Sequence, residues 1–326
     1  CSNLASADLS GVEEIGNGAF KWCNQLESVN LSQNLKKIGA EAFSSDNKKL
    51  NIEIPDSVTE IGREAFKGCF NLTNVKIPKG LTTLESSVFA NCSSITSFEI
   101  PETVTKICGA ILVCTSVTHV EIPDTVTEIN TDSIFANCKK LESVRLPSCT
   151  TEIGSLAFNV CTALKSVNIP YGVTTIGMRG FGECKSLETI ELPETMTSIG
   201  SYAFTQCAAL KTIVIPAGVT SIGNGAFGGC SALEDIVIPA SATSIGRAAF
   251  TTCTALENIV IPEGVTSLES YVFNGCTALK TVVIPASVTS IAADAFKNCE
   301  KLTIHGQAGS YAETWAKENG VPFVSL

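Results

Sequence analysis

Hydrophobic and polar positions repeat along this chain with a period of 23 residues. The clearest marker of the period is a phenylalanine, which stands at Phe20, Phe43, Phe66, Phe89, Phe135, Phe158, Phe181, Phe204, Phe227, Phe250, Phe273 and Phe296. Leu112 occupies the one position where the series lacks a phenylalanine. A fixed period of this length is typical of repeat proteins, whose units stack on their neighbours in sequence.

The first half of each repeat predicts a short strand. In the repeat that begins at Leu210, Ile213 and Ile215 alternate with Val214. This is the period-2 pattern of a strand with one buried face. Pro216 follows and ends the strand, because proline lacks the N–H group that a parallel neighbour would need.

The second half of the repeat predicts a return past the core and a tight turn. Val219 and Ile222 supply apolar side chains for the return, and Gly223 is expected to allow a sharp bend. Phe227 and Cys230 lie three residues apart, which suits a helical or 3₁₀ turn with both side chains facing inward.

The fold class follows from the repeat, since one coil cannot bury its own apolar face and a stack of coils can. We predict a single domain built mainly from parallel strands. Its repeat array covers residues 1–301, in about thirteen coils of which the first is partial. Residues 302–326 are predicted to form a C-terminal cap of the same domain.

The cap is predicted to contain a helix and a final strand. Residues 310–313 match a capping box that opens a helix, and 319–320 end it. Residues 321–324 should fold back as a terminal strand. The apolar residues on one face of the helix are Ala312, Trp315 and Ala316. Two roles are open for Trp315: a cover for the core of the last coil, which we favour, or a platform on which a sugar stacks.

The whole repeat, L-x-x-V-x-I-P-x-x-V-T-x-I-G-x-x-A-F-x-x-C, resembles the BspA-type (Treponema-type) leucine-rich repeat over nearly the whole chain. The resemblance implies a right-handed parallel solenoid with the strand on its concave side. It also implies a bacterial or protist surface protein, since some members of the family are adhesins for host matrix proteins or other microbes. The family supplies no catalytic residues, and its ligands differ between members, so the resemblance informs the fold more than the partner.

Fifteen cysteines would indicate a disulfide-rich protein if their spacing did not follow the repeat. Most occupy one slot, three residues after the phenylalanine: Cys23, Cys69, Cys92, Cys138, Cys161, Cys184, Cys207, Cys230, Cys253, Cys276 and Cys299. Cys114 fits the slot with one residue deleted, and Asp46 breaks the series. Parallel side chains in a stack hold their Cβ atoms wider than a disulfide prefers, and a column does not converge on a point as zinc requires. We predict buried free thiols, with sporadic disulfides or a metal as the alternatives.

Three cysteines lie outside this pattern. Cys108 and Cys149 are the better candidates for exposed or reactive thiols, although stray packing is the interpretation we favour. Cys1 could be the lipidated start of a mature bacterial lipoprotein. However, Leu4 follows Cys1 at the spacing found in the repeats, so we favour a column cysteine of an earlier coil. That interpretation predicts a chain that begins inside the repeat array.

Composition excludes several classes of function. The net charge is −10, and without a cluster of Lys and Arg such a chain repels phosphate backbones and anionic lipid, so no nucleic acid is expected as a partner. The chain has no stretch of 18 consecutive apolar residues, so insertion into a membrane is not expected. The only histidines, His119 and His305, are too far apart in the array to share a site, so we expect no catalytic residues, metal or cofactor. A polysaccharide-cleaving β-helix enzyme would need long insertions to wall a cleft, and the uniform coils argue against one.

Candidate contact residues occupy the outward slot of the predicted strand. Along the chain this slot holds Asn30, Glu53, Lys76, Glu99, Glu121, Arg145, Asn168, Glu191, Val214, Val237, Val260 and Val283. The last four are valines, and we expect them to form an apolar stripe flanked by Lys211, Glu234 and Lys280. Adjacent exposed apolar residues indicate an interaction surface. The alternative is that valine merely favours strands and was copied when repeats duplicated.

The function predicted from these features is a secreted or cell-surface, adhesin-like module that binds a protein or a glycan without catalysis. The partner would be a host matrix or microbial surface protein or glycan, and the chain itself would be an extracellular monomer. The alternative is a passive spacer within a longer surface protein.

Overall fold

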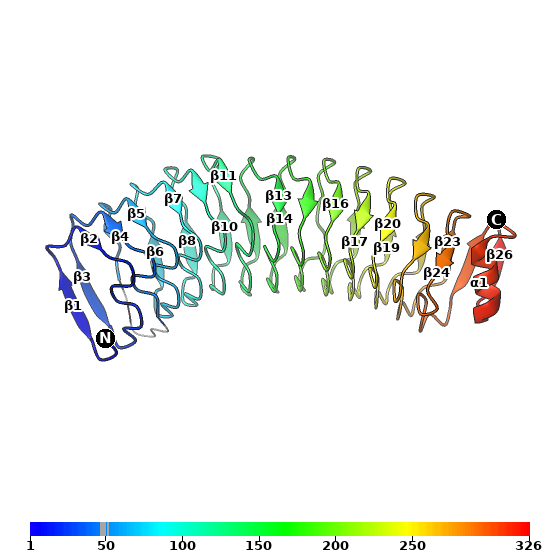
Figure 1. Cartoon of the computed structure of the whole chain (residues 1–326), viewed down its shortest axis with the longest axis horizontal. Helices are drawn as coiled ribbons and strands as arrows, with labels where there is room; N and C mark the ends of the chain where they lie inside the picture. The colour runs from blue at the N-terminus through cyan, green and yellow to red at the C-terminus, as the bar shows by residue number, and fades with distance from the viewer. Residues whose placement is uncertain (46–49, 51) are drawn as a thin grey trace. The chain divides into compact units, whose positions relative to one another are not determined.

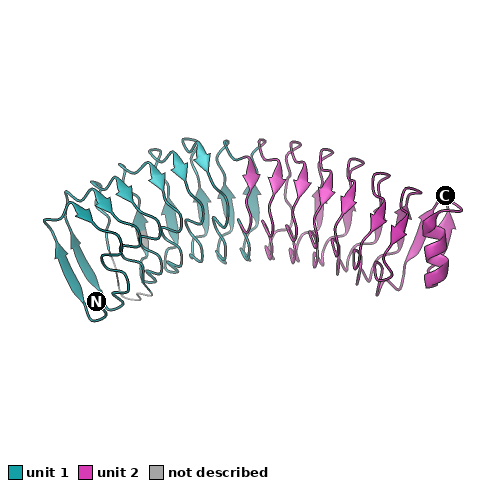
Figure 2. Ribbon diagram, viewed as in Figure 1, with its two compact units in different colours: residues 1–150, 157–170 teal, residues 151–156, 171–326 magenta. Residues whose placement is uncertain are grey.

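The computed structural model describes residues 1–45, 50 and 52–326, with the side chain of Asn74 left out. The chain divides into two compact units, which are described separately here (Figure 2). Unit 1 comprises residues 1–150 and 157–170, and unit 2 comprises residues 151–156 and 171–326.

Unit 1 is a stack of coils, most of which contribute two short strands. The first strands are β1 (Ser6–Leu9), β3 (Ser28–Leu31), β6 (Asn74–Lys76), β8 (Ser97–Glu99), β10 (His119–Glu121), β12 (Ser143–Arg145) and β14 (Ser166–Asn168). The second strands are β2 (Glu14–Ile15), β4 (Lys37–Ile38), β5 (Glu60–Ile61), β7 (Thr83–Leu84), β9 (Lys106–Ile107) and β11 (Glu128–Ile129). Each pairs in parallel with a strand of a neighbouring coil, for example β10 with β12 (Figure 1).

Unit 2 repeats this arrangement and ends in a helix. Its first strands are β17 (Thr212–Val214), β19 (Asp235–Val237), β21 (Asn258–Val260), β23 (Thr281–Ile284), β25 (Thr303–Gly306) and β26 (Phe323–Ser325). Its second strands are β13 (Glu152–Ile153), β15 (Thr175–Ile176), β16 (Ser198–Ile199), β18 (Ser221–Ile222), β20 (Ser244–Ile245), β22 (Ser267–Leu268) and β24 (Ser290–Ile291). The predicted parallel solenoid with 23-residue coils is confirmed, since Ile213 pairs with Ile236 and Ile222 with Ile245.

The core of each unit is a stack of phenylalanine rings. In unit 2, Phe204 and Phe227 are both fully buried, with ring centroids 5.4 Å apart and planes within 6°. The stack continues at similar spacing to Phe273 and Phe296. Leu112 fills the predicted gap in unit 1 and is also fully buried. The parallel strands hold the coils about 4.8 Å apart, so the rings meet almost face to face with a lateral offset.

The turn that carries the phenylalanine has the i to i−3 hydrogen bonds of the predicted 3₁₀ turn at alternate residues only, so it is not a continuous helix. Tyr202 and Gln206 have positive φ angles of 59° and 58°, which interrupt any continuous helix. The reason lies in the hydrogen bonds. Amide groups of alternate residues point to the next coil: Tyr202 N–H bonds Asn224 O, Phe204 N–H bonds Ala226 O and Gln206 N–H bonds Gly228 O, each at 2.7 Å. A regular 3₁₀ helix would keep those donors within its own coil. Here only the intervening amides do so, as Thr205 N–H bonds Tyr202 O at 3.0 Å, and the others pair with the next coil.

The glycine after the second strand has a different role from the predicted bend. Gly223 does not have a positive φ, but a Cβ built on it would lie 2.5 Å from Ser201 N and 2.6 Å from Gly200 C. Glycine is therefore needed because the backbones of successive coils approach closely.

The ladder of second strands follows this glycine. In unit 1, β2, β4 and β5 precede glycines and share a sheet, while β7, which precedes Glu85, belongs to another sheet. In unit 2 the sheet of β13 to β20 likewise ends before β22, which precedes Glu269. Pairing thus stops within each unit where glycine is replaced by a larger residue. It resumes among successive non-glycine coils, such as those of Glu269 and Ala292.

The C-terminal cap forms as predicted. Helix α1 (Tyr311–Asn319) begins at Ser310, whose side chain accepts a hydrogen bond from Glu313 N, and ends at Gly320 in the left-handed conformation. Trp315 is 5% exposed and meets Phe296 edge-on, with centroids 5.5 Å apart and planes at 64°. β26 pairs in parallel with β25 and completes the final turn. The face of the indole is buried, which fits a cover for the core rather than a platform for a stacked sugar.

Candidate functional site

The outward face of the first strands in unit 2 carries the predicted valine stripe. Val214, Val237 and Val260 are 76%, 68% and 60% exposed, and Val283 is half-buried. Val214 is in register with Val237, and Val260 with Val283. β19 and β21 pack side by side between the two pairs. The inward neighbours Ile213 and Ile236 are buried, so the alternation of the strand places the valines outward.

The stripe continues beyond the four predicted valines. Val283 is in register with His305 of β25, and His305 is in register with Val324 of β26, which is 45% exposed. We did not expect these two positions, because the cap breaks the 23-residue period that located the others. The register of the terminal strand is what brings Val324 into line. We call Val214, Val237, Val260, Val283, His305 and Val324 the strand stripe.

The same slot in unit 1 is polar, and some of its side chains pair with the neighbouring coil. Asn30 donates to Asp8 across adjacent strands at 3.0 Å. The backbone hydrogen bond from Ser148 N–H and the pairing with Arg145 at 2.5 Å hold the pKa of the Asp124 carboxyl below its usual value. The slot is therefore polar in unit 1, and its apolar outward residues lie in unit 2.

The charged residues beside the stripe differ in whether they have partners. Lys211 pairs with Glu188 at 3.1 Å and Lys280 with Glu257 at 2.7 Å. These exposed pairs contribute little to stability, about 0–1 kcal/mol each. Glu234 and its neighbour Asp235 are exposed, and neither has an ion pair among the described residues. The middle of the stripe is thus flanked by two unpaired carboxylates.

The cysteine column contains free thiols, and it differs from a simple apolar filler. Most of these thiols donate to the carbonyl oxygen of the phenylalanine in the preceding coil, as Cys253 does to Phe227 at 3.2 Å and Cys276 to Phe250 at 3.1 Å. Burial raises the pKa of Cys253 to about 12, so the thiol stays protonated at neutral pH. A protonated, buried thiol is neither a nucleophile nor a metal ligand. Asp46, where the series was expected to break, lies outside the described residues.

Cys108 and Cys149, which lie outside the column, are not activated thiols either. Cys108 and Cys149 are half-buried, and burial is the main cause that raises the pKa of each. Cys149 also donates to Val126 O at 3.1 Å. Both side chains thus resemble packed residues more than reactive ones.

Residues with catalytic or metal-binding chemistry are dispersed. His119 lies in unit 1, where Nδ1 contacts the Thr118 hydroxyl at 3.0 Å, and His305 lies in unit 2. Across residues 1–45, 50 and 52–326, no group of three His, Cys, Asp or Glu side chains is placed to hold a metal ion. None of the helices in the described part of the chain is long and apolar enough to span a bilayer.

Comparisons with known proteins agree with this architecture. A family model described as "BspA type Leucine rich repeat region (6 copies)" matches residues 13–141, 130–257 and 174–303. The chain is similar to a leucine-rich repeat protein from Bacteroides ovatus, with 26% identity and a TM-score of 0.79 over 98% of this chain and 92% of that one. It is also similar to a leucine rich cell surface protein from Faecalibacterium prausnitzii, with 30% identity and a TM-score of 0.59 over 95% and 81% of the two chains. A comparison with curated proteins found no match.

Proposed function

Because the chain belongs to the BspA-type leucine-rich repeat family, we propose that it is a non-catalytic module that binds a protein partner through the strand stripe of unit 2. The observation that carries the proposal is the run of outward valines in register, Val214 with Val237 and Val260 with Val283. Solvent-facing apolar residues that adjoin one another indicate a surface that is covered in use.

The binding free energy that the exposed valines can contribute is limited. Full burial of a valine side chain contributes about 1.5–3 kcal/mol. Since Val214, Val237 and Val260 expose 60–76% of their area, their burial contributes about 1–2 kcal/mol each, or about 3–6 kcal/mol together. Association costs about 4–15 kcal/mol in lost freedom. The valines therefore need polar contacts around them to give measurable affinity.

The flanking charges indicate the chemistry of those contacts. Glu234 and Asp235 are exposed beside Val237 and have no ion pair among the described residues. A partner that presents apolar side chains next to a Lys or Arg would fill the stripe and neutralise these carboxylates. A glycan fits the stripe less well, because its hydroxyl groups would lose hydrogen bonds against valine. The partner class we propose is a host matrix protein or a microbial surface protein.

The proposed location rests on a structural relative of the chain. One structural relative is a cell surface protein from a bacterium, and we propose a bacterial, secreted or surface-displayed location for this chain as well. The uniform coils leave the strand face without long insertions, which supports binding rather than catalysis. A passive spacer would have the same fold but no partner for the stripe.

A binding screen with a matched pair of variants tests the proposal. The immobilised chain is screened by biolayer interferometry against extracellular matrix proteins and microbial surface proteins, and each hit is repeated with V237K/V260K. Loss of two buried valines should weaken the Kd by about 30-fold or more, since each 1.4 kcal/mol is tenfold. Thermal stability should change little, because both positions are exposed.

The control variant is T243K/T266K, which adds the same charge to the same two coils at exposed positions six residues beyond the valines. Binding should survive in this variant. Equal losses in both double variants would show that charge rather than the stripe matters and would contradict the proposal. Silence across the whole screen would favour the spacer.

A further inference from the structure

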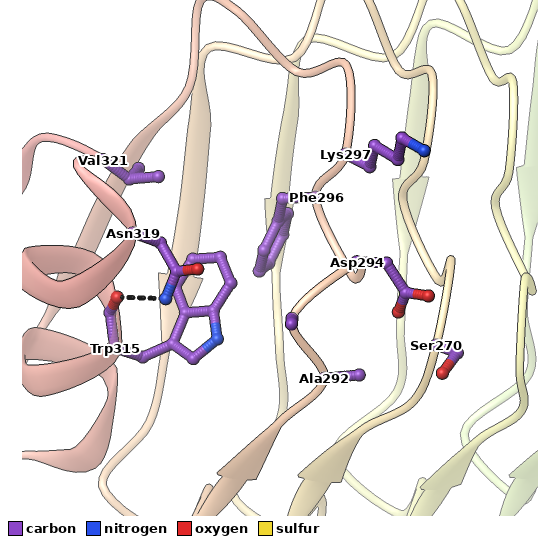
Figure 3. Close-up of a pocket in the computed structure, with 9 residues that line it drawn as sticks. Ser270, Ala292, Asp294, Phe296, Lys297, Trp315, Asn319 and Val321 are labelled. Atoms are coloured by element: carbon purple, nitrogen blue, oxygen red, sulfur yellow. Dashed lines mark hydrogen bonds between the residues drawn. The ribbon is translucent and has the colours of Figure 1, made fainter.

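A groove in unit 2 lies between the cap helix and the last coil (Figure 3). Its volume is about 550 Å³, within the range of about 300–1,000 Å³ that is usual for small-molecule sites. The residues that line it are Ser270, Ala292, Ala293, Asp294, Phe296, Lys297, Trp315, Asn319 and Val321. The strand stripe contributes none of them, so the groove is separate from the proposed protein-binding surface.

The groove arises because the cap does not continue the ring stack. Within unit 2, Phe250 and Phe273 stack nearly parallel at 5.4 Å, which leaves no space between coils. At the end, Trp315 meets Phe296 at 64° instead, so it covers the ring without filling the space beside it. Ala292 and Ala293 border that space with small side chains, which keeps it open.

The indole N–H of Trp315 opens into this groove. The residue is only 5% exposed, and its N–H has no hydrogen-bond partner among the described residues. The nitrogen is nevertheless not one of their polar atoms that are shielded from solvent and unpaired, so it keeps some contact with solvent. Figure 3 shows the indole nitrogen on the edge of the ring that faces Ala292. Because this N–H reaches solvent at the groove, an acceptor on an incoming ligand can replace the water that it meets there.

The rim supplies complementary polar groups. Asn319 donates through Nδ2 to Trp315 O at 2.8 Å, which leaves its Oδ1 to accept a hydrogen bond. The carboxylate of Asp294 and the ammonium of Lys297 have no side-chain partners among the described residues, and both line the groove. The site therefore offers both hydrogen-bond donors and acceptors, and the opposite charges of its one acidic and one basic residue cancel.

We propose that this groove binds one neutral sugar residue of a glycan. Each sugar hydroxyl can donate to Asp294 or Asn319 and accept from Trp315 or Lys297, while the C–H face of the ring packs on Phe296 and Val321. An anion would meet the carboxylate of Asp294, and a purely apolar ligand would leave the Trp315 N–H and the Asp294 carboxylate without partners. Both classes fit the groove less well than a polyhydroxylated, uncharged ring.

Fluorescence of Trp315 tests the proposal directly. The chain has two tryptophans, and Trp22 is exposed in unit 1, so W22F leaves Trp315 as the only indole reporter. The full-length W22F chain is titrated with neutral mono- and disaccharides, a sulfated monosaccharide and inorganic phosphate. We expect saturable quenching or a spectral shift with at least one neutral sugar. Asp294→Ala in the same background should weaken that binding about tenfold or more.

Glu300→Ala is the control, since Glu300 is exposed and does not line the groove. It should bind as the W22F parent does. No response to any neutral sugar up to 50 mM would overturn the proposal, and so would preference for the sulfated sugar or phosphate. Binding that Asp294→Ala leaves unchanged would place the sugar elsewhere and would equally overturn it. A melting curve of each variant verifies that it is folded.

Discussion

Replacing Gly223 with alanine tests how closely the coils approach one another. The added Cβ would lie 2.5 Å from Ser201 N, whereas ordinary contacts begin at 3.4 Å, so the coils must separate locally by about 0.9 Å. The bond from Gly223 N–H to Ile199 O, now 2.8 Å, would then exceed hydrogen-bond length. Unit 2 already shows this outcome at Glu269, where β20 and β22 no longer share a sheet.

The cost follows from the interactions lost. Two ladder hydrogen bonds contribute about 0.5–1.5 kcal/mol each, and overpacking adds about 1–3 kcal/mol. We expect Gly223→Ala to lower the free energy of unfolding by about 2–6 kcal/mol. At roughly 2 °C per kcal/mol for a chain of this size, Tm falls by about 4–12 °C. Circular dichroism during thermal and urea unfolding measures both quantities.

Gly16→Ala is the matched control for this prediction. Gly16 occupies the same slot in the first described coil, and a Cβ built on it has no atom within 4 Å. Its substitution should change the stability by less than about 0.5 kcal/mol. If Gly223→Ala and Gly16→Ala unfold at the same temperature, close approach is not the reason for the glycine, and the argument is refuted.

Three further predictions concern the core and the cap. Burial raises the pKa of Cys92 and Cys253 to about 12, above the value near 8.5 for an unfolded thiol, so the stability they contribute is complete below about pH 8.5 and is lost as pH rises toward 12. The urea concentration at the unfolding midpoint should therefore decrease as the pH is raised from 8.5 to 11. A smaller decrease in Cys253→Ala would identify the thiol as a cause, and an equal decrease would assign the loss to other groups. Phe250→Ala should cost about 3–5 kcal/mol and Phe20→Ala clearly less, because Phe250 is fully buried and Phe20 only half-buried; equal losses by urea denaturation would contradict this. Trp315→Ala should uncover Phe296 and raise the fluorescence of a hydrophobic dye such as ANS at temperatures where the wild type binds none; an unchanged signal would show that the helix covers the core without it.

The fold was predictable from the sequence because each coil repeats the same chemistry. The alternation around Val214 placed the strand, Phe227 placed the core, and the motif at 310–313 placed the helix. These features are local, and the period repeats them until chance agreement is negligible. The stack of coils could therefore be predicted without any knowledge of the contacts between coils.

Features that depend on the neighbouring coil could not be predicted. The positive φ of Tyr202 arises because its amide bonds Asn224 of the next coil, and no pattern within one repeat indicates this. The role of Gly223 likewise depends on the backbone of Gly200. The thiol of Cys253 bonds the carbonyl of Phe227, which distinguishes cysteine from alanine in a slot where either would fit by size.

The candidate site was predictable only in part. Alternation placed Val237 and Val260 outward, but Val324 joined the stripe through the pairing of β26 with β25. The groove beside Trp315 depends on the edge-on angle at which its ring meets Phe296, and sequence spacing does not determine that angle. Surfaces that cross the boundary between repeat and cap are the ones that the repeat period does not locate.

The central claim is that a partner protein covers the strand stripe, and a methyl NMR footprint tests it most directly. Valine methyl groups are labelled with ¹³C, and the spectrum is recorded with and without a partner obtained from the screen. The account predicts that the signals of Val214, Val237 and Val260 shift or broaden, while that of Val104, fully buried in unit 1, stays in place. Unchanged signals from the three stripe valines, in a sample where the partner is bound, would contradict the claim.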